Sequence, residues 1–210
     1  MKRAQQGFTL VELAVVLLII GLLLGGVLKG QSLIDSAKVK NLAQDFRSLP
    51  ALVHVYQDRF RALPGDDLRA TGHLCAGAAS CTTAGNGNGL LDGNWDDSSS
   101  SESFLFWQHV RLAELASGST VTTAEDYLPR NAMGGRLGVQ SSSVLGLQGN
   151  VLVCSAAIPG KLVRQLDQQL DDGDPASGSV RAGSGSGSAL TAITAATLDD
   201  DQAYTVCARL

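Results

Sequence analysis

The sequence has no excess of basic residues and none of the short motifs that mark common enzyme classes. Its 210 residues include 16 Lys and Arg against 20 Asp and Glu, a formal net charge of −4. Duplex nucleic acid is bound through a basic face, so this balance argues against it as the main partner. No GxSxG, HExxH, Walker or dinucleotide motif is present. The enzyme alternative is a membrane-anchored hydrolase that uses His109 and a loop carboxylate, and we predict instead that the chain is not an enzyme.

One long apolar run stands near the N-terminus. Residues 8–28 carry a single charge, Glu12, in 21 positions, and as a helix they would be about 31 Å long, the thickness of one hydrocarbon core. Lys2 and Arg3 precede the run, as expected for an end that stays in the cytoplasm. The run is too long for a secretory signal, and no A-x-A cleavage site follows it. A plain anchor fits the length but leaves Glu12 in the membrane segment at a cost of about 2–3 kcal/mol.

The residues around Glu12 resemble a processing motif. The string Gly7-Phe8-Thr9-Leu10-Val11-Glu12-Leu13 is similar to the cleavage site of type IV prepilins and type II secretion pseudopilins. The resemblance implies that a prepilin peptidase cuts after Gly7 and methylates the new amino group of Phe8. Glu12 is then the fifth residue, where its carboxylate can pair with the Phe8 ammonium of a neighbouring subunit. Two charges that are each costly in lipid become an ion pair.

The resemblance also implies where the protein lies and what it contacts. The chain would cross the bacterial inner membrane once, with a cytoplasmic N-terminus and a periplasmic head, and would then enter a filament. Its partners would be the peptidase, other pilin or pseudopilin subunits and the assembly platform of the inner membrane. The chain divides into a cleaved leader (1–7), a membrane or filament-core helix (8–28), an amphipathic half of that helix (29–63) and an exported head (64–210).

The helical pattern continues beyond the apolar run. Apolar residues recur at intervals of three and four residues, which predicts one buried stripe of a helix; they are Leu42, Phe46, Leu49, Val53, Tyr56 and Phe60. The turn signal Pro64-Gly65-Asp66 ends the pattern. A long helix of this kind followed by a mixed head resembles the pilin architecture. We therefore expect an α+β, pilin-like fold in which this helix packs on a small antiparallel sheet with extra short helices and loops.

The head shows several short elements. Glu102–Ala116 predicts a second helix, with Ser99 and Glu102 at capping-box spacing. Strands are expected near 136–139, 151–155 and 204–209, and Pro159 begins a short amphipathic helix. The Gly-Ser repeat at 183–188 is expected to be a flexible loop without core-forming residues.

Four cysteines in an exported head predict disulfide bonds. Of the three possible connectivities we favour Cys75–Cys81, which closes a short loop, and Cys154–Cys207, which joins two adjacent apolar strands. A zinc site is the alternative, but the chain has no C-x2-C pair and its three histidines are scattered.

Two loops are rich in oxygen ligands. Asn86, Asn88, Asp92 and Asp96 alternate with glycines and loosely resemble a calcium loop, although the EF-hand pattern is incomplete. A surface Asn-Gly turn is the simpler interpretation of this loop. The second cluster, Asp171, Asp172 and Asp174, is interpreted as a solvated helix end. No cofactor is expected beyond the calcium that these loops allow.

The favoured function is that of a minor pilin-like structural subunit. The membrane half of the helix has glycines where many major pilins have a proline, which favours a minor pilin or a pseudopilin, and the large head favours the minor pilin. A type II secretion pseudopilin is the first alternative. The alternative from another class is a singly anchored periplasmic binding protein, with calcium as a candidate ligand, that never enters a filament.

Overall fold

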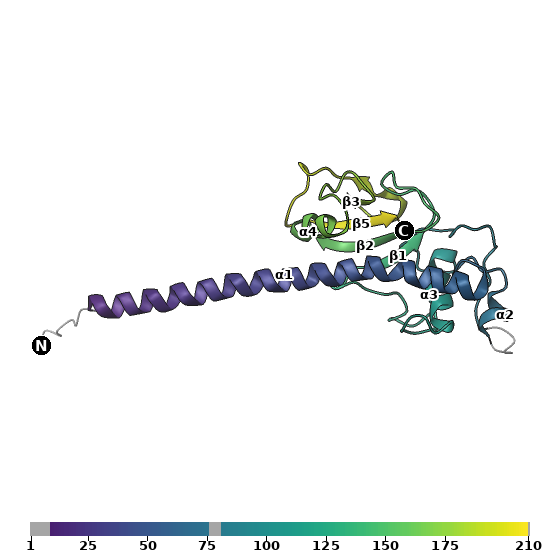
Figure 1. The fold of residues 1–210 in the computed structure, drawn as a ribbon, viewed down its shortest axis with the longest axis horizontal. Coiled ribbons are helices and arrows are strands. Elements are labelled where there is room, and N and C mark those ends of the chain that lie inside the picture. Colours follow the sequence, from purple (N-terminus) through teal and green to yellow (C-terminus); the bar gives the residue numbers. More distant parts are fainter. Residues whose placement is uncertain (1–8, 76–80, 210) are drawn as a thin grey trace, which may run out of the picture. The chain divides into compact units, whose positions relative to one another are not determined.

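The computed structural model describes residues 9–75 and 81–209. Its helices are α1 (Leu10–Phe60), α2 (Ala70–Leu74), α3 (Glu102–Leu112), α4 (Gly160–Leu170) and the short 3-10 helix η1 (Gly187–Ala189). Its strands are β1 (Leu137–Gln140), β2 (Leu152–Pro159), β3 (Val180–Ser184), β4 (Thr191–Ala192) and β5 (Ala203–Arg209) (Figure 1). This is the α+β, pilin-like arrangement that the sequence predicts.

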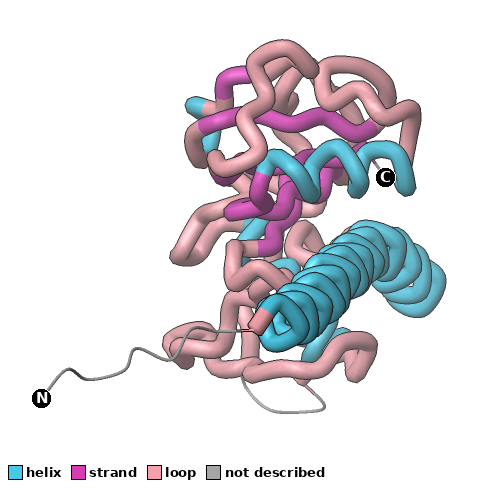
Figure 2. Tube along the Cα trace, turned by 90° about the vertical axis from the view of Figure 1, so that its left-hand side faces the viewer, coloured by secondary structure: helices cyan, strands magenta, loops and turns pink. Residues whose placement is uncertain are grey.

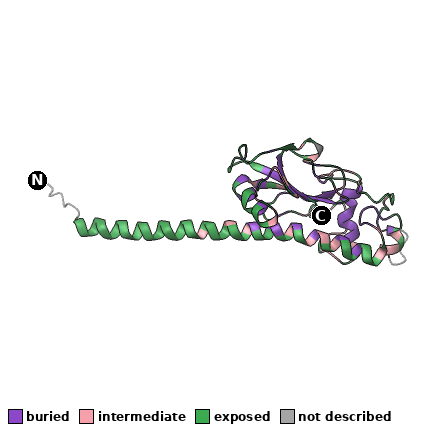
Figure 3. Cartoon of the chain, turned by 45° about the horizontal axis from the view of Figure 1, so that its top comes forward, coloured by how far each residue is buried: buried purple, intermediate pink, exposed green. Residues whose placement is uncertain are grey.

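The chain forms two compact units, residues 1–38 and 39–210, and α1 contributes to both. In the first unit the described part is helix, and its large apolar side chains are exposed: Leu17 is 69% exposed and Leu22 is 71% exposed (Figure 3). Within the described residues, α1 is the one helix long and apolar enough to cross a membrane. An unburied apolar surface of this size needs lipid or other chains to cover it.

The second unit, hereafter the head, begins with the second half of α1. Its buried side chains recur every three or four residues, as the sequence predicts; they are Val39, Leu42, Ala43, Phe46, Leu49, Val53 and Tyr56. Phe60, the last residue of the predicted stripe, is only partly buried. The helix continues through Pro50. The stripe belongs to one hydrophobic core with residues of α3 and the sheet.

The sheet has five antiparallel strands in the order β1-β2-β5-β3-β4. Three of them, β1, β2 and β5, lie where the sequence predicts strands. The predicted helix after Pro159 is α4, which lies against β2, β3 and β5 (Figure 2). The expectation for the Gly-Ser repeat is wrong at its start, because Gly183 pairs with Thr205 of β5 and with Ala192 of β4.

Helix α3 is buried on all sides, from Glu102 to Arg111. Its predicted cap is wrong: Ser101, not Ser99, is the N-cap, and its hydroxyl accepts a hydrogen bond from the backbone N–H of Phe104. The helix also ends at Leu112, four residues earlier than expected. The carboxylate of Glu102 does not cap α3, because it accepts hydrogen bonds from backbone N–H groups of the preceding loop.

Candidate functional site

The first turn of α1 is closed by a reciprocal cap. The backbone N–H and the hydroxyl of Thr9 both donate to Oε2 of Glu12, each at 2.8 Å, and the N–H of Glu12 donates to the Thr9 hydroxyl at 3.3 Å. Thr9 and Glu12 thus occupy the two positions of a capping box. Their T-x-x-E spacing is the local sequence signal of such a box. Gly7 and Phe8, the predicted cleavage site, lie outside the described residues.

Beyond this cap the helix offers a small-residue surface. Gly21, Gly25, Gly26 and Gly30 have no heavy atom within 4 Å of the position that a Cβ would take. Glycines spaced by four residues allow the backbones of membrane helices to approach closely. The two hydrogen bonds that reach the Glu12 carboxylate within the described chain both come from Thr9, so its charge has no cationic partner there.

A family model described as the Prokaryotic N-terminal methylation motif matches residues 2–28. These residues contain the predicted cleavage site, the capping box and most of the exposed apolar run. The chain carries the methylation motif of type IV pilins and pseudopilins. The motif implies processing by a prepilin peptidase and assembly with other pilins, and the single apolar helix fits a membrane-anchored subunit. No significant match was found among curated proteins or solved structures.

The head of this pilin-like chain carries two disulfide bonds, in the pairing that the sequence favours. Cys154 and Cys207 face each other on β2 and β5, with both residues fully buried and their Cα atoms 4.1 Å apart. Cys75 and Cys81 close a short loop beside α3. The described residues contain no free cysteine, so thiolate ligands for zinc are not available there.

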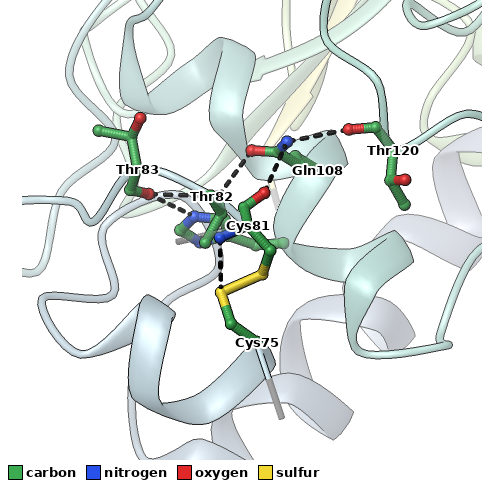
Figure 4. The surroundings of a disulfide bond; sticks show 7 residues. Cys75, Cys81, Thr82, Thr83, Gln108 and Thr120 are labelled. Carbon is green, nitrogen blue, oxygen red and sulfur yellow. Dashed lines mark hydrogen bonds between the residues drawn. A yellow bond between two sulfur atoms is a disulfide. The ribbon is translucent and has the colours of Figure 1, made fainter. Parts of the chain in front are cut away.

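Gln108 of α3 binds the chain at Cys81 and at Thr82, which follows the disulfide bond (Figure 4). Its side-chain amide donates to the carbonyl oxygens of Thr120 at 2.9 Å and Cys81 at 3.4 Å, and its Oε1 accepts from the hydroxyl of Thr82 at 2.6 Å. A single buried side chain therefore satisfies three groups of the surrounding loops.

The loop proposed as a calcium site is organised around Asp66. This carboxylate, 3% exposed, accepts hydrogen bonds from the backbone N–H groups of Gly87, Asn88 and Gly89, at 2.6–3.1 Å. Oε1 and Oε2 of Glu102 accept from the N–H groups of Asn86 and Asp92. Burial and the charges of Asp66 and Asp92 raise the pKa of Glu102, while these two hydrogen bonds oppose the rise. The buried carboxylates of Asp66 and Glu102 thus already accept hydrogen bonds from the protein itself.

The predicted ligands of this loop are only partly brought together. The side-chain amides of Asn86 and Asn88 donate to Oδ2 of Asp92, at 2.7 and 3.4 Å. The Asp96 carboxylate lies instead near Gly187, 3.2 Å from the position of a Cβ there, in a different part of the head. Calcium at Asn86, Asn88 and Asp92 stays a prediction, and the two amides already donate to the Asp92 carboxylate.

A network of polar side chains, absent from the sequence predictions, surrounds Asp67. Oδ2 of Asp67 lies 2.6 Å from Nδ1 of His73 and accepts a hydrogen bond from the Tyr56 hydroxyl at 2.9 Å. Burial alone would raise the pKa of Asp67, but the hydrogen bonds from His73, the backbone of Arg69 and Tyr56 outweigh it and lower the pKa. Burial and the neighbouring Asp67 raise the pKa of Tyr56, which stays protonated.

Asp67 and His73 line a pocket of about 850 Å³, together with Arg61, Leu68 and Arg69. An aspartate orients the histidine in many hydrolases. Here the same carboxylate oxygen also binds a protonated tyrosine, which is a poor nucleophile. The arrangement can bind a polar ligand, and it lacks the activated nucleophile that a hydrolase of this type requires.

His109, the residue of the hydrolase alternative, is fully buried in the head. Its Nδ1 accepts from the backbone N–H of Gly65 at 2.9 Å, which leaves Nε2 to donate to the carbonyl of Thr83 at 3.0 Å. Burial lowers its pKa, although the hydrogen bond to Thr83 and the charge of Asp67 oppose this. With both nitrogens engaged by the backbone, His109 joins two loops to α3 and is not positioned for acid–base catalysis.

Proposed function

We propose that the chain is a minor pilin-like subunit of a type IV pilus-type filament, cleaved after Gly7, methylated at Phe8 and assembled through α1. One observation carries the proposal: Glu12 lies in the first turn of an unburied apolar helix, where Thr9 caps it and no cation pairs with it among the described residues. A carboxylate in lipid is costly until a cation joins it. The methylated amine of a neighbouring Phe8 supplies that cation when subunits assemble, and it sets the register between them.

In this proposal the chain first crosses the inner membrane with its head in the periplasm. The exposed apolar surface of α1 then exchanges lipid for neighbouring helices, and the glycine surface allows a close approach. The head, which buries its own core, covers the outside of the filament. The prepilin peptidase and the inner-membrane assembly platform are the partners required for these steps.

Two variants separate the charge of Glu12 from its capping role. Glutamine at the third helical position still accepts the Thr9 N–H, so Glu12→Gln removes the charge and keeps the cap. We expect it to lower the amount of subunit in sheared filaments by about tenfold or more, equivalent to about 1.4 kcal/mol of lost pairing, with unchanged membrane levels. Thr9→Ala, the matched control, weakens the cap, keeps the charge and should assemble nearly normally. Normal assembly of Glu12→Gln would contradict the ion pair.

N-terminal sequencing and intact mass of the protein from its native membrane test the processing step. A methylated Phe8 at the first position is expected. A chain that still begins at Met1 in cells containing the peptidase would instead support the singly anchored binding protein, which the pocket at Asp67 could serve. Deleting the gene separates the two filament roles: loss of pili supports a minor pilin, and loss of protein secretion supports a pseudopilin.

A further inference from the structure

The segment that ends α4 brings three carboxylates together. Side-chain oxygens of Asp167, Asp171 and Asp172 all lie within 4.8 Å of one another. The sequence suggests a different group, Asp171, Asp172 and Asp174, in solvent at the helix end. The structure adds Asp167 from the last turns of α4, whereas the side chain of Asp174 accepts from the backbone N–H of Ala176.

Asp167 is the unusual member, because it is buried and no cation pairs with it within the described structure. It is 1% exposed, and neither oxygen of its carboxylate makes a hydrogen bond of normal geometry there. The groups that act on its charge are the backbone N–H of Gly173, which favours the charged form, and the carboxylates of Asp171, Asp172 and Asp174, which oppose it. Asp167 follows Val163 by four residues, so it lies on the helix face that packs on the sheet. A buried carboxylate without a cation costs several kcal/mol, which points to a ligand that the polypeptide does not supply.

The position on the helix adds to this cost. The C-terminal end of a helix carries a partial negative charge, which repels carboxylates. The last turn of α4 contains no basic residue. Arg47 of α1 reaches this end of α4, but it donates to the backbone carbonyl of Gln169 at 3.2 Å and not to a carboxylate. Nothing in these contacts neutralises the three acids.

The other two carboxylates are fixed by the loop that follows. Oδ2 of Asp171 accepts from the backbone N–H groups of Ser179 and Val180, at 2.5 and 3.0 Å. Asp172 accepts from the N–H of Asp174 at 2.9 Å and from the hydroxyl of Ser177 at 2.8 Å. The donors of Asp171 both use Oδ2, so its other oxygen can face the group. These two acids are held in place before any ligand arrives.

We propose that Asp167, Asp171 and Asp172 bind one Ca²⁺ ion. Calcium is bound by six to eight oxygens at about 2.3–2.6 Å, so two oxygens on the same ion lie at most about 5 Å apart, and the spacing here satisfies this limit. Carboxylates suit a hard cation, and the exposed side of Asp172 leaves room for water ligands. The ion would tie the end of α4 to the beginning of β3, since Asp171 also holds Ser179 and Val180.

The test uses the full-length protein in detergent, stripped of metal with a chelator, and calcium chloride as the only added ligand. Equilibrium dialysis with radioactive calcium should show one ion per chain, with an affinity near the 10⁻⁴–10⁻³ M range of extracellular calcium modules. At about ten times the dissociation constant, calcium should raise the melting temperature by about 3–6 °C.

Asp167→Asn keeps the shape of the side chain and removes its charge. We expect calcium affinity to fall by about tenfold or more and the melting temperature of this variant to respond little to calcium. Because an unpaired buried charge is removed, metal-free Asp167→Asn should melt no lower than the metal-free wild type. Asp201→Asn, an exposed aspartate elsewhere in the head, is the matched control and should bind like the wild type.

Three results would overturn the proposal. The first is no calcium binding at about 1 mM, the upper end of the range for extracellular modules. A proton shared between Asp167 and Asp172 would then stabilise the buried carboxylate in place of the ion. The second is unchanged affinity in Asp167→Asn. The third is binding that Asp92→Asn removes and Asp167→Asn does not, which would place the ion in the other loop. Should Asp167→Asn fail to fold, exposed Asp172 carries the same test as Asp172→Asn.

Discussion

The two units of the chain differ in the exposure of their apolar side chains. In residues 9–38 the large apolar side chains are exposed, and the glycines meet no neighbouring atoms. In the head the apolar side chains form a core, and most buried polar groups have partners within the chain, as at Asp66, Gln108 and His109. The exceptions in the described part of the head are few, and Asp167 is the only carboxylate among them.

This difference separates the roles of the units. The head has the contacts it needs to fold, so substitutions there should change its stability. The first unit lacks such contacts, and its surface is completed only by lipid or by other subunits. Both tryptophans, Trp95 and Trp107, are buried in the head, so tryptophan fluorescence of the full-length protein reports the unfolding of the head alone. With urea as denaturant, that signal measures the free energy of unfolding of the head.

Removing the disulfide bond between β2 and β5 should have the largest effect. Cys154 and Cys207 are separated by 53 residues, and a bond closing such a loop stabilises by about 4 kcal/mol in the chain-entropy description. Cys154→Ala/Cys207→Ala should lower the free energy of unfolding by about that amount. The matched control, Cys75→Ala/Cys81→Ala, opens a six-residue separation and should cost about 2 kcal/mol. Equal losses would show that loop length is not what matters here.

Asp66→Asn should come second. The substitution leaves one acceptor oxygen where the carboxylate serves three backbone N–H groups, and it turns an amide group toward a donor. An unsatisfied buried donor costs about 1–3 kcal/mol, so we expect a loss of about 2 kcal/mol. In Asp92→Asn the lost contacts are with exposed side-chain amides, and the expected change is below about 0.5 kcal/mol. A similar loss in both variants would show that the loop is not organised around Asp66.

His109 should make the stability of the head depend on pH. Burial lowers its pKa below the ordinary value of 6.5. The unfolded chain then binds more protons than the folded chain as the pH falls below 6.5, so the folded state is destabilised, by at most about 1.4 kcal/mol per pH unit. His109→Gln, which does not titrate, should remove this contribution between pH 7 and 5.

Much of the fold can be predicted from the sequence, because the spacing of apolar residues shows which helix face is buried and the cysteines lie on or beside the predicted elements. The stripe from Leu42 to Tyr56 and the helix after Pro159 are of this kind. The cap of α3 is different: Glu102 binds the N–H groups of Asn86 and Asp92, so tertiary contacts decide its role. Strand β3 was missed because Gly183 has no side chain to signal pairing, and only its partner strands define it.

The candidate sites also divide into those that local sequence predicts and those that depend on tertiary contacts. Glu12 could be found from its motif, since the chemistry of processing depends on consecutive residues. The importance of Asp167 could not be found from charge clustering, which emphasises Asp171, Asp172 and Asp174. A signal was present nonetheless: a four-residue spacing from Val163 places Asp167 on the apolar face of α4, where a solvated acid is not expected. The pairing of Asp67 with His73 and Tyr56 depends on how the turn after α1 folds back, and no local pattern carries that information.

The smallest effect is expected in the first unit and bears most directly on the comparison. At Gly25 a Cβ would meet no heavy atom within 4 Å, whereas at Gly138 of β1 it would lie 1.8 Å from the carbonyl oxygen of Trp95. Gly25→Ala should therefore change the unfolding of the head by less than about 0.5 kcal/mol, while Gly138→Ala, the same substitution, should destabilise it clearly. Circular dichroism should show no loss of helix in Gly25→Ala, because alanine favours helix over glycine by about 1 kcal/mol. A destabilised head in Gly25→Ala would mean that the two units share folding energy, and the separation of their roles would then be wrong.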